Sequence, residues 1–277
     1  MRLEPSPFQP CWDDSKTSYA DLCIIYTVII GKVDQPCSLV NANLREFHPY
    51  LITDSNVVAS KAKLLGWSII IDMTNNADTI LISRYYKMHP HVLFPLSRST
   101  LYVDGNIEVN DLGSYSMRSN LRDTIVLSKH PYRVSSLDEV LAFAKAGTVP
   151  ISTFVKSLFL AITFESSIKR EDIQLCEMNV IYCSRPSYSC QSILYLWWLL
   201  FNISGSIRDQ HVFPIAVFLS GRRENVCVDP VSNMRIIGRS GLYLNIINRH
   251  RGRFSNLYRK LTVIPFVVFV KLLRALK

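Results

Sequence analysis

Motifs of simple, fixed spacing are missing from this sequence. Its seven cysteines include no C-x-x-C pair, and nothing resembles a P-loop, a Rossmann glycine motif, a nucleophile elbow or a zinc-protease helix. Ten glycines and thirteen prolines among 277 residues are too few for a collagen-like or low-complexity chain. The odd, scattered cysteines are typical of reduced thiols in a cytosolic protein.

Long hydrophobic runs are missing as well. No stretch reaches the roughly 20 apolar residues that cross a bilayer. The longest runs are 192–203 and 261–273, and Pro265 interrupts the second. The N-terminal sequence MRLEPSPFQPCWDD lacks the apolar core of a signal peptide. We therefore expect a cytoplasmic protein.

Acidic residues are absent after Asp229, where ten basic residues follow. Removing those ten from the 31 basic residues leaves 21 against all 22 acids, so the body is almost neutral. A basic tail is suited to a membrane surface, to nucleic acid or to an anionic substrate, or it is simply solvated.

Apolar segments are plentiful, because 48% of the residues are hydrophobic, which is enough to build a core. Alternating strands and helices predict an α/β fold with a mostly parallel central sheet flanked by helices, and with a basic C-terminal helical tail. The expected strands are 21–30, 50–53, 67–71, 100–103 and 180–183, and the expected helices are 57–65, 82–93, 136–147 and 191–201. Ser136 is the expected N-cap of the third helix.

Polar residues follow three of these strands. Gly31 ends the first strand, Asp54 the second, and Asp104 with Asn106 the fourth. Ligands of parallel sheets bind beyond the carboxyl ends of the strands. If the strands are parallel neighbours, these residues meet at one edge of the sheet.

The tripeptide Asp104-Gly105-Asn106 is a candidate metal site. A diphosphate leaving group needs a divalent cation to neutralise its developing charge, and hard cations prefer oxygen ligands. The same three residues are equally a good turn sequence.

Two further groups of polar residues have both a functional and a structural interpretation. Arg84 and Lys87 share a helix face and either grip phosphates or form a solvated basic surface. Glu177 is either a base or an exposed charge at a strand edge.

The triplet Arg208-Asp209-Gln210 binds sugar hydroxyls, or it forms a buried structural ion pair. His89 and His91 are expected to be structural. Trp197 and Trp198 are expected in the core.

Taken in order, the motifs resemble a glycosyltransferase-like family found in capsular polysaccharide loci and among plant cell-wall proteins. The resemblance covers roughly residues 21–220. It rests on IYTVIIG at 25–31, LITD at 51–54, GW at 66–67, SRYYKMHPH at 83–91, LYVDGN at 101–106, KHPYR at 129–133 with Glu139, EMNVI at 177–181, WW at 197–198 and SIRDQ at 206–210 with Phe213. Lys32, the stretch 134–137 and residues 221–277 depart from the family pattern.

The resemblance implies a GT-A-like fold that binds a nucleotide sugar, with the α/β domain at 19–225 between a polar lead-in (1–18) and a basic extension (226–277). Asp104 and Asn106 would stand where such enzymes keep a metal-binding Asp-x-Asp, which implies Mn or Mg. Glu177 and Asp209 are the implied catalytic residues. The implied substrate-binding residues are Tyr26, Gly31 and Asp54 for the nucleotide, Arg84 and Lys87 for the diphosphate, and His130, Arg208 and Gln210 for the rest of the substrate.

The leading hypothesis is therefore a metal-dependent glycosyltransferase of surface or capsular polysaccharide synthesis. Its acceptor would be a glycan or a lipid-linked molecule, and residues 253–277 would dock peripherally on the anionic inner face of a membrane. The alternative is a non-catalytic protein on the same fold that binds a nucleotide sugar or a polysaccharide. Nucleic-acid binding is not expected, because the body is neutral and the tail has few aromatic residues for base stacking.

Overall fold

The computed structural model describes residues 10–12, 22–31, 35–39, 42–74, 78–109, 112, 121–146, 149–165, 174–184, 188–206, 208–229 and 235–236. The basic tail from residue 237 on lies outside these residues, and so do Lys32, Gly147 and most of the predicted lead-in.

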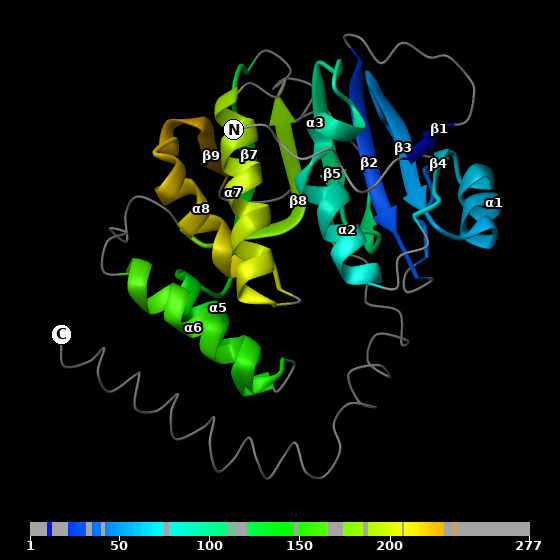
Figure 1. The fold of residues 1–277 in the computed structure, drawn as a ribbon. Coiled ribbons are helices and arrows are strands. Elements are labelled where there is room, and N and C mark those ends of the chain that lie inside the picture. The colour runs from blue at the N-terminus through cyan, green and yellow to red at the C-terminus, as the bar shows by residue number, and fades with distance from the viewer. Residues whose placement is uncertain are drawn as a thin grey trace.

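An eight-stranded sheet forms the centre of the described structure (Figure 1). Its order is β1-β4-β3-β2-β5-β8-β7-β9, and β1 and β8 run opposite to the other six strands. The mostly parallel sheet is therefore confirmed. Its strands are β1 (Pro10–Trp12), β2 (Cys23–Ile29), β3 (Phe47–Thr53), β4 (Ser68–Asp72), β5 (Ser99–Val103), β7 (Ile125–Lys129), β8 (Cys176–Ser184) and β9 (Val226–Asp229).

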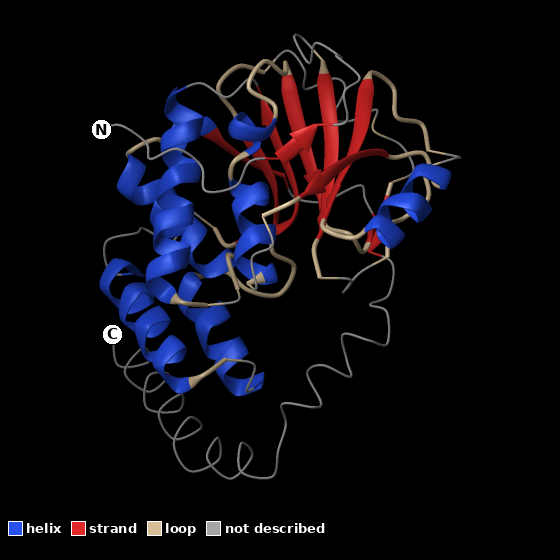
Figure 2. Ribbon diagram, turned by 45° about the vertical axis from the view of Figure 1, so that its right-hand side comes forward, coloured by secondary structure: helices blue, strands red, loops and turns tan. Residues whose placement is uncertain are grey.

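Helices cover both faces of this sheet (Figure 2). They are α1 (Asn56–Leu64), α2 (Thr79–Met88), α3 (Pro90–Leu93), α5 (Ser136–Ala146), α6 (Ile151–Glu165), α7 (Tyr188–Ser204) and α8 (Phe213–Ser220), with 3-10 turns η2 (Gln210–Val212) and η3 (Arg223–Asn225). A separate two-stranded sheet joins β6 (Ile107–Glu108) to β10 (Arg235–Ile236).

Strand β2 shows how the sequence produces these layers. All seven of its residues are buried, and successive side chains point to opposite faces. Ile24 and Tyr26 pack in a core with residues of α2 and α7, while Cys23 and Ile25 pack in a second core with residues of α1. A strand that is buried on both faces needs a continuous apolar run, which the sequence supplies at 21–30.

Two predicted boundaries differ from the structure. The helix expected at 82–93 is two helices, because Pro90 lacks an N–H and His89 before it leaves the helical conformation at φ −125°, ψ 52°. The strand expected at 180–183 begins at Cys176, so Glu177 lies within β8 and not before it.

The N-cap of α5 is shifted by one residue from the prediction. The Ser135 hydroxyl accepts from the Asp138 N–H at 3.2 Å, and the Asp138 carboxylate accepts from the Ser135 N–H at 3.2 Å. Ser135 and Asp138 therefore form the reciprocal capping pair, and Ser136 is the first helical residue.

Candidate functional site

The ends of β2 and β3 meet, as their parallel register requires. The Gly31 N–H, directed from the turn after β2, lies 3.1 and 3.2 Å from the two carboxylate oxygens of Asp54. Gly31 has φ +76°, and a Cβ there would lie 2.9 Å from the Thr79 Cγ2 atom at the start of α2. Only glycine combines this conformation with such close packing, so the turn fixes where α2 begins.

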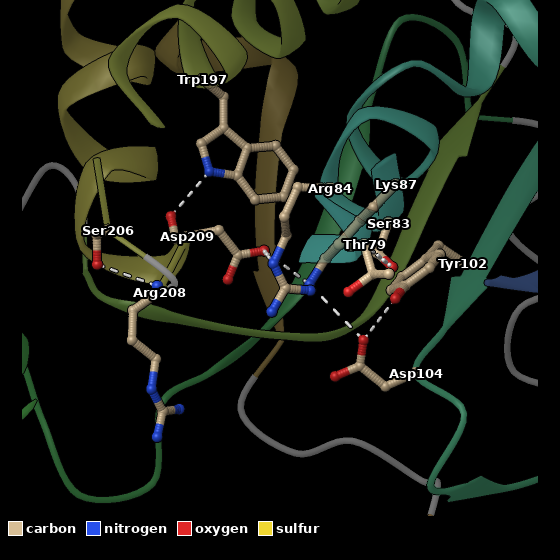
Figure 3. Close-up of polar contacts among 10 residues, drawn as sticks. All are labelled: Thr79, Ser83, Arg84, Lys87, Tyr102, Asp104, Trp197, Ser206, Arg208 and Asp209. Carbon is tan, nitrogen blue, oxygen red and sulfur yellow. Dashed lines mark hydrogen bonds and ion pairs between the residues drawn. The ribbon is translucent and has the colours of Figure 1, made fainter. Parts of the chain in front are cut away.

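Four charged side chains come together beside the end of β5, and we term Arg84, Lys87, Asp104 and Asp209 the ion-pair cluster (Figure 3). Lys87 Nζ lies 2.9 Å from Asp209 Oδ2 and 3.8 Å from Asp104 Oδ1. Arg84 Nε lies 3.5 Å from the same Asp209 oxygen. The cluster joins α2, the loop after β5 and the segment before η2, which are distant in the sequence.

Lys87 is the most deeply buried member of the cluster, with 2% of its side chain exposed. Its ammonium lies over the rings of Tyr102 and Trp197, at 5.0 and 5.9 Å from their centroids. Both rings attract a cation through their π faces. A solvated basic surface therefore does not describe this face of α2.

Tyr26 of β2 holds the C-terminal end of α2 through hydrogen bonds to its backbone. Its side chain is buried, and its hydroxyl donates to the carbonyl oxygens of Tyr86 and Lys87 at 3.3 and 3.2 Å. Burial raises the pKa of Tyr26 well above its ordinary value. Tyr26 thus fixes the end of α2 at Lys87, a member of the ion-pair cluster.

Asp209 is an ionised carboxylate inside the protein. Burial alone would raise its pKa, but the charges of Arg84 and Lys87 and the hydrogen bond from Lys87 outweigh burial and lower it to about 2. The Trp197 indole N–H donates to the Asp209 carbonyl at 2.8 Å, which holds the backbone in place. Trp197 is buried, as expected from the sequence, and this anchoring bond is a second role that the sequence does not reveal.

Asp104 belongs to a turn and also faces the ion-pair cluster. Its carbonyl accepts from the Ile107 N–H at 2.9 Å, and its carboxylate accepts from the Tyr102 hydroxyl at 2.6 Å. Half-buried Asn106 lies in the same turn. Burial, and then the charge of Asp104, raise the pKa of Glu177 on the neighbouring strand β8. The D-G-N tripeptide therefore forms a turn, and its interpretation as a metal site stays a prediction.

A divalent cation at this turn would need ligands beyond the protein. Within the described residues, no group of three or more His, Cys, Asp or Glu side chains is arranged to hold a metal. Asp104 and Asn106 offer side-chain oxygens, which are the donors that Mg²⁺ and Mn²⁺ accept. They fit such an ion if phosphate oxygens of a bound nucleotide complete its coordination.

A second polar group surrounds His130, at the end of β7. The ring nitrogen Nδ1 accepts from the backbone N–H groups of Tyr132 and Arg133 at 3.1 and 3.0 Å. The Arg133 guanidinium lies 3.3 Å from the other nitrogen, Nε2, and pairs with buried Glu139. We term residues 130–135 the His130 loop.

The predicted site residues therefore fall into three groups. Arg84, Lys87, Asp104 and Asp209 make direct contacts, with Glu177 and Asn106 nearby. Gly31 and Asp54 form a separate pair at the ends of β2 and β3, and His130 lies in its own loop. Half-buried Gln210 opens η2 beside Asp209.

The two histidines near Pro90 have structural surroundings. Buried His89 stacks on Tyr85 with ring centroids 4.3 Å apart, and its Nδ1 lies 2.9 Å from the Tyr85 carbonyl oxygen. His91 lies 5.6 Å from His89 between ring centroids. Burial lowers the pKa of both histidines to about 4.

A helix needs about 20 apolar residues to cross a bilayer. Among the helices in the described parts of the chain, none is long and apolar enough to cross a membrane.

Comparisons with known proteins leave the motif resemblance as a prediction. No protein-family model matches this chain, and no curated protein matches it. Among solved structures it is similar to CMP:2-keto-3-deoxy-manno-octonic acid synthetase complexed with CTP, at 9% sequence identity and a TM-score of 0.43. The match covers 83% of this chain and 98% of that one. At this identity and score the likeness carries no argument about function, which rests on the residues of the site.

Proposed function

We propose that this protein is a glycosyltransferase that moves a sugar from a nucleotide-sugar donor to an acceptor. One observation carries the proposal. Two cations, Arg84 and Lys87, are fixed by the buried carboxylate of Asp209 at the carboxyl end of a mostly parallel sheet, beside Asp104. Ligands of such sheets bind at this edge, and fixed cations stabilise the charge that develops on a diphosphate leaving group.

The exposed fractions of the four side chains indicate which of them can contact the substrate and which hold the others in place. The side chains of Arg84 and Asp104 are 24% and 26% exposed, so a diphosphate can reach them from solvent. Lys87 and Asp209 lie behind them. We assign Asp209 as a positioning residue, because a carboxyl with a pKa of about 2 accepts a proton poorly at neutral pH.

Glu177 is the proposed general base. Burial and the charge of Asp104 raise its pKa, and a carboxylate of higher pKa is a stronger base. In this role it accepts the proton of the attacking acceptor hydroxyl. The leaving nucleoside diphosphate carries the electron pair of the broken glycosidic bond.

A bound Mn²⁺ or Mg²⁺ would neutralise diphosphate charge from the side of Asp104 and Asn106. The two side chains would hold the ion through their oxygens. Arg84 and Lys87 supply positive charge to the same group from α2.

The replacement Asp104→Asn tests this function, since it keeps the shape of the side chain and removes its charge. We expect one nucleotide sugar in a panel to be hydrolysed slowly in the presence of Mn²⁺ or Mg²⁺. Turnover should fall at least about a hundredfold in the variant, the loss typical of one removed electrostatic contact to a transition state. Glu224→Gln, at an exposed acid of η3, should retain full activity.

Three outcomes separate the hypotheses. Metal-dependent hydrolysis that the variant loses supports the transferase. Donor binding without turnover favours the non-catalytic binding protein. If no nucleotide sugar binds under any metal condition, the proposed function is wrong.

We further propose that residues 253–277 attach the protein to an anionic membrane surface. This segment contains six basic residues, no acid and the apolar run 261–273. Basic residues beside apolar ones bind at the interface of an anionic membrane. The full chain should pellet with vesicles rich in anionic lipid, and a chain ending at Ser255 should stay in the supernatant. Equal pelleting of both would contradict this attachment.

A further inference from the structure

We propose that the His130 loop and Arg208 bind a second anion, a phosphate or diphosphate carried by the acceptor. This inference rests on the proposed function, and it narrows the acceptor to a phosphorylated molecule. Three observations support it: the tautomer of His130, the charge around it, and the backbone that separates it from the ion-pair cluster.

The hydrogen bonds of His130 fix the position of its proton. Nδ1 faces two backbone N–H groups, from Tyr132 and Arg133, at 3.1 and 3.0 Å. Backbone N–H groups only donate, so Nδ1 must accept and cannot carry a proton. A neutral imidazole carries one proton, which therefore lies on Nε2.

The proton on Nε2 then faces another donor. The Arg133 guanidinium nitrogen Nη1 lies 3.3 Å from Nε2, and a guanidinium has no acceptor. Two donors at this distance cannot satisfy each other. An oxygen of an anion placed against both groups would accept from each of them. The Arg133 side chain is 34% exposed, so solvent reaches this position.

The charge near His130 is also unbalanced. Glu139 pairs with Arg133, and Asp138 is engaged in capping α5. Burial and then the charge of Arg133 lower the pKa of His130, and the charge of Arg208 contributes in the same direction, against that of Glu139. Arg208 has no ion-pair partner among the described residues. Two positive charges and one negative charge thus act on His130, which leaves one positive charge for a ligand.

The backbone at Arg208 and Asp209 separates this group from the ion-pair cluster. Figure 3 shows the Asp209 side chain directed toward Arg84 and Lys87, and the Arg208 side chain directed away from them. The Ser206 hydroxyl accepts from the Arg208 N–H at 3.0 Å, and Trp197 holds the Asp209 carbonyl, so both residues are fixed.

Helix α5 lies next to this segment. The His211 ring of η2 packs edge-on against Phe143 of α5, with ring centroids 5.4 Å apart. The His130 loop leads directly into α5, and Arg208 comes just before η2, so the loop and Arg208 adjoin two elements that pack together. A donor diphosphate at the ion-pair cluster and a second anion at the His130 loop would therefore bind on opposite sides of one rigid segment.

The test measures the binding of inorganic phosphate to the full-length protein, without donor or turnover. The side-chain nitrogen signals of His130 are followed by NMR during the titration. We expect a saturable shift at Nε2 in the wild type, and at least tenfold weaker binding in Arg208→Gln. Arg222→Gln, at an exposed arginine, is the matched control and should bind as the wild type does.

A parallel titration with a nucleoside diphosphate separates the two anion sites. In the presence of Mg²⁺, its affinity should fall in Asp104→Asn or Arg84→Gln and remain within about twofold in Arg208→Gln. Competition by a soluble sugar 1-phosphate, or by a polyprenyl diphosphate in detergent, then identifies the source of the acceptor phosphate.

Three results would overturn the second site. The first is that the wild type does not bind phosphate. The second is that Arg208→Gln and Arg222→Gln weaken phosphate binding equally. The third is that Arg208→Gln lowers the affinities for phosphate and for the nucleoside diphosphate by the same factor. Phosphate binding that persists in a protein without donor binding would instead refute the transferase and leave this site intact.

Discussion

Replacing Lys87 by methionine should lower the free energy of unfolding by about 3–5 kcal/mol, the range for breaking a buried ion pair from one side. Methionine keeps most of the volume of the lysine stem but removes the ammonium 2.9 Å from Asp209. Arg84, whose Nε lies 3.5 Å from Asp209, is then the more distant of the two cations and the one that remains. Urea unfolding at pH 7 measures the loss.

The double variant Lys87→Met with Asp209→Asn provides the decisive comparison. Removing both charges should recover a large part of the loss, because the buried carboxylate that lost its nearest cation is then removed as well. Lys145→Met, at an exposed lysine of α5, should change the free energy of unfolding by no more than about 0.5 kcal/mol. If Lys87→Met has an effect as small as this control, the ion-pair cluster is not the electrostatic centre that the distances indicate.

Acid should destabilise the protein well above the pH at which its carboxylates titrate. Burial lowers the pKa of His89, His91 and His211 to about 4, from an ordinary value of 6.5. Between these values the unfolded chain takes up protons that the folded chain refuses. The free energy of unfolding should therefore fall, as pH decreases from about 6.5 to about 4, by up to about 1.4 kcal/mol per pH unit for each histidine.

Two acids with shifted pKa values also contribute to the dependence of stability on pH. The lowered pKa of Asp209 stabilises the fold above its ordinary value of 3.8, and that stability is lost only as pH falls toward about 2. The raised pKa of Glu177 acts in the opposite direction to the histidines, since its folded form protonates first as pH falls. Three histidines outweigh one half-buried glutamate, so the net slope remains destabilising.

Urea midpoints at pH 7.5, 6.0 and 5.0 measure this slope, and His211→Phe provides the control. Phenylalanine fills a similar volume against Phe143 and cannot be protonated. In the variant, the slope of the free energy of unfolding against pH should be smaller by up to about 1.4 kcal/mol per pH unit. The slope that His89 and His91 contribute should remain. A midpoint that does not change between pH 7.5 and 5.0 would show that the histidines titrate normally in the folded protein.

Local sequence signals predict much of the sheet and only part of the helical layer. Residues 21–30 are a continuous apolar run because β2 is buried on both faces. Helix α6 was missed, although Phe154, Leu158 and Ala161 are buried at helical spacing. Exposed Val155 and Phe159 on its other face hide that periodicity.

The ion-pair cluster shows a similar division. The three-residue spacing of Arg84 and Lys87 predicts a shared face of one helix, and the D-G-N tripeptide follows an evident strand. That Asp209 meets Lys87 depends on how α7 and η2 pack against α2, which no local pattern encodes. The Ser135 cap was missed by one residue because two serines stand in succession and both precede an acid at capping distance.

The antiparallel strand β8 has a consequence for the order in which the protein can fold during synthesis. β8 lies between β5 and β7 and pairs with both, yet it follows both of them in the sequence. The strands from β2 to β5 can pair as soon as they leave the ribosome, whereas β7 has no neighbour in the sheet until residue 176 has emerged. The sheet is therefore completed only when β8 pairs with β5 and β7. Such late pairing between strands distant in the sequence is a slow step in folding.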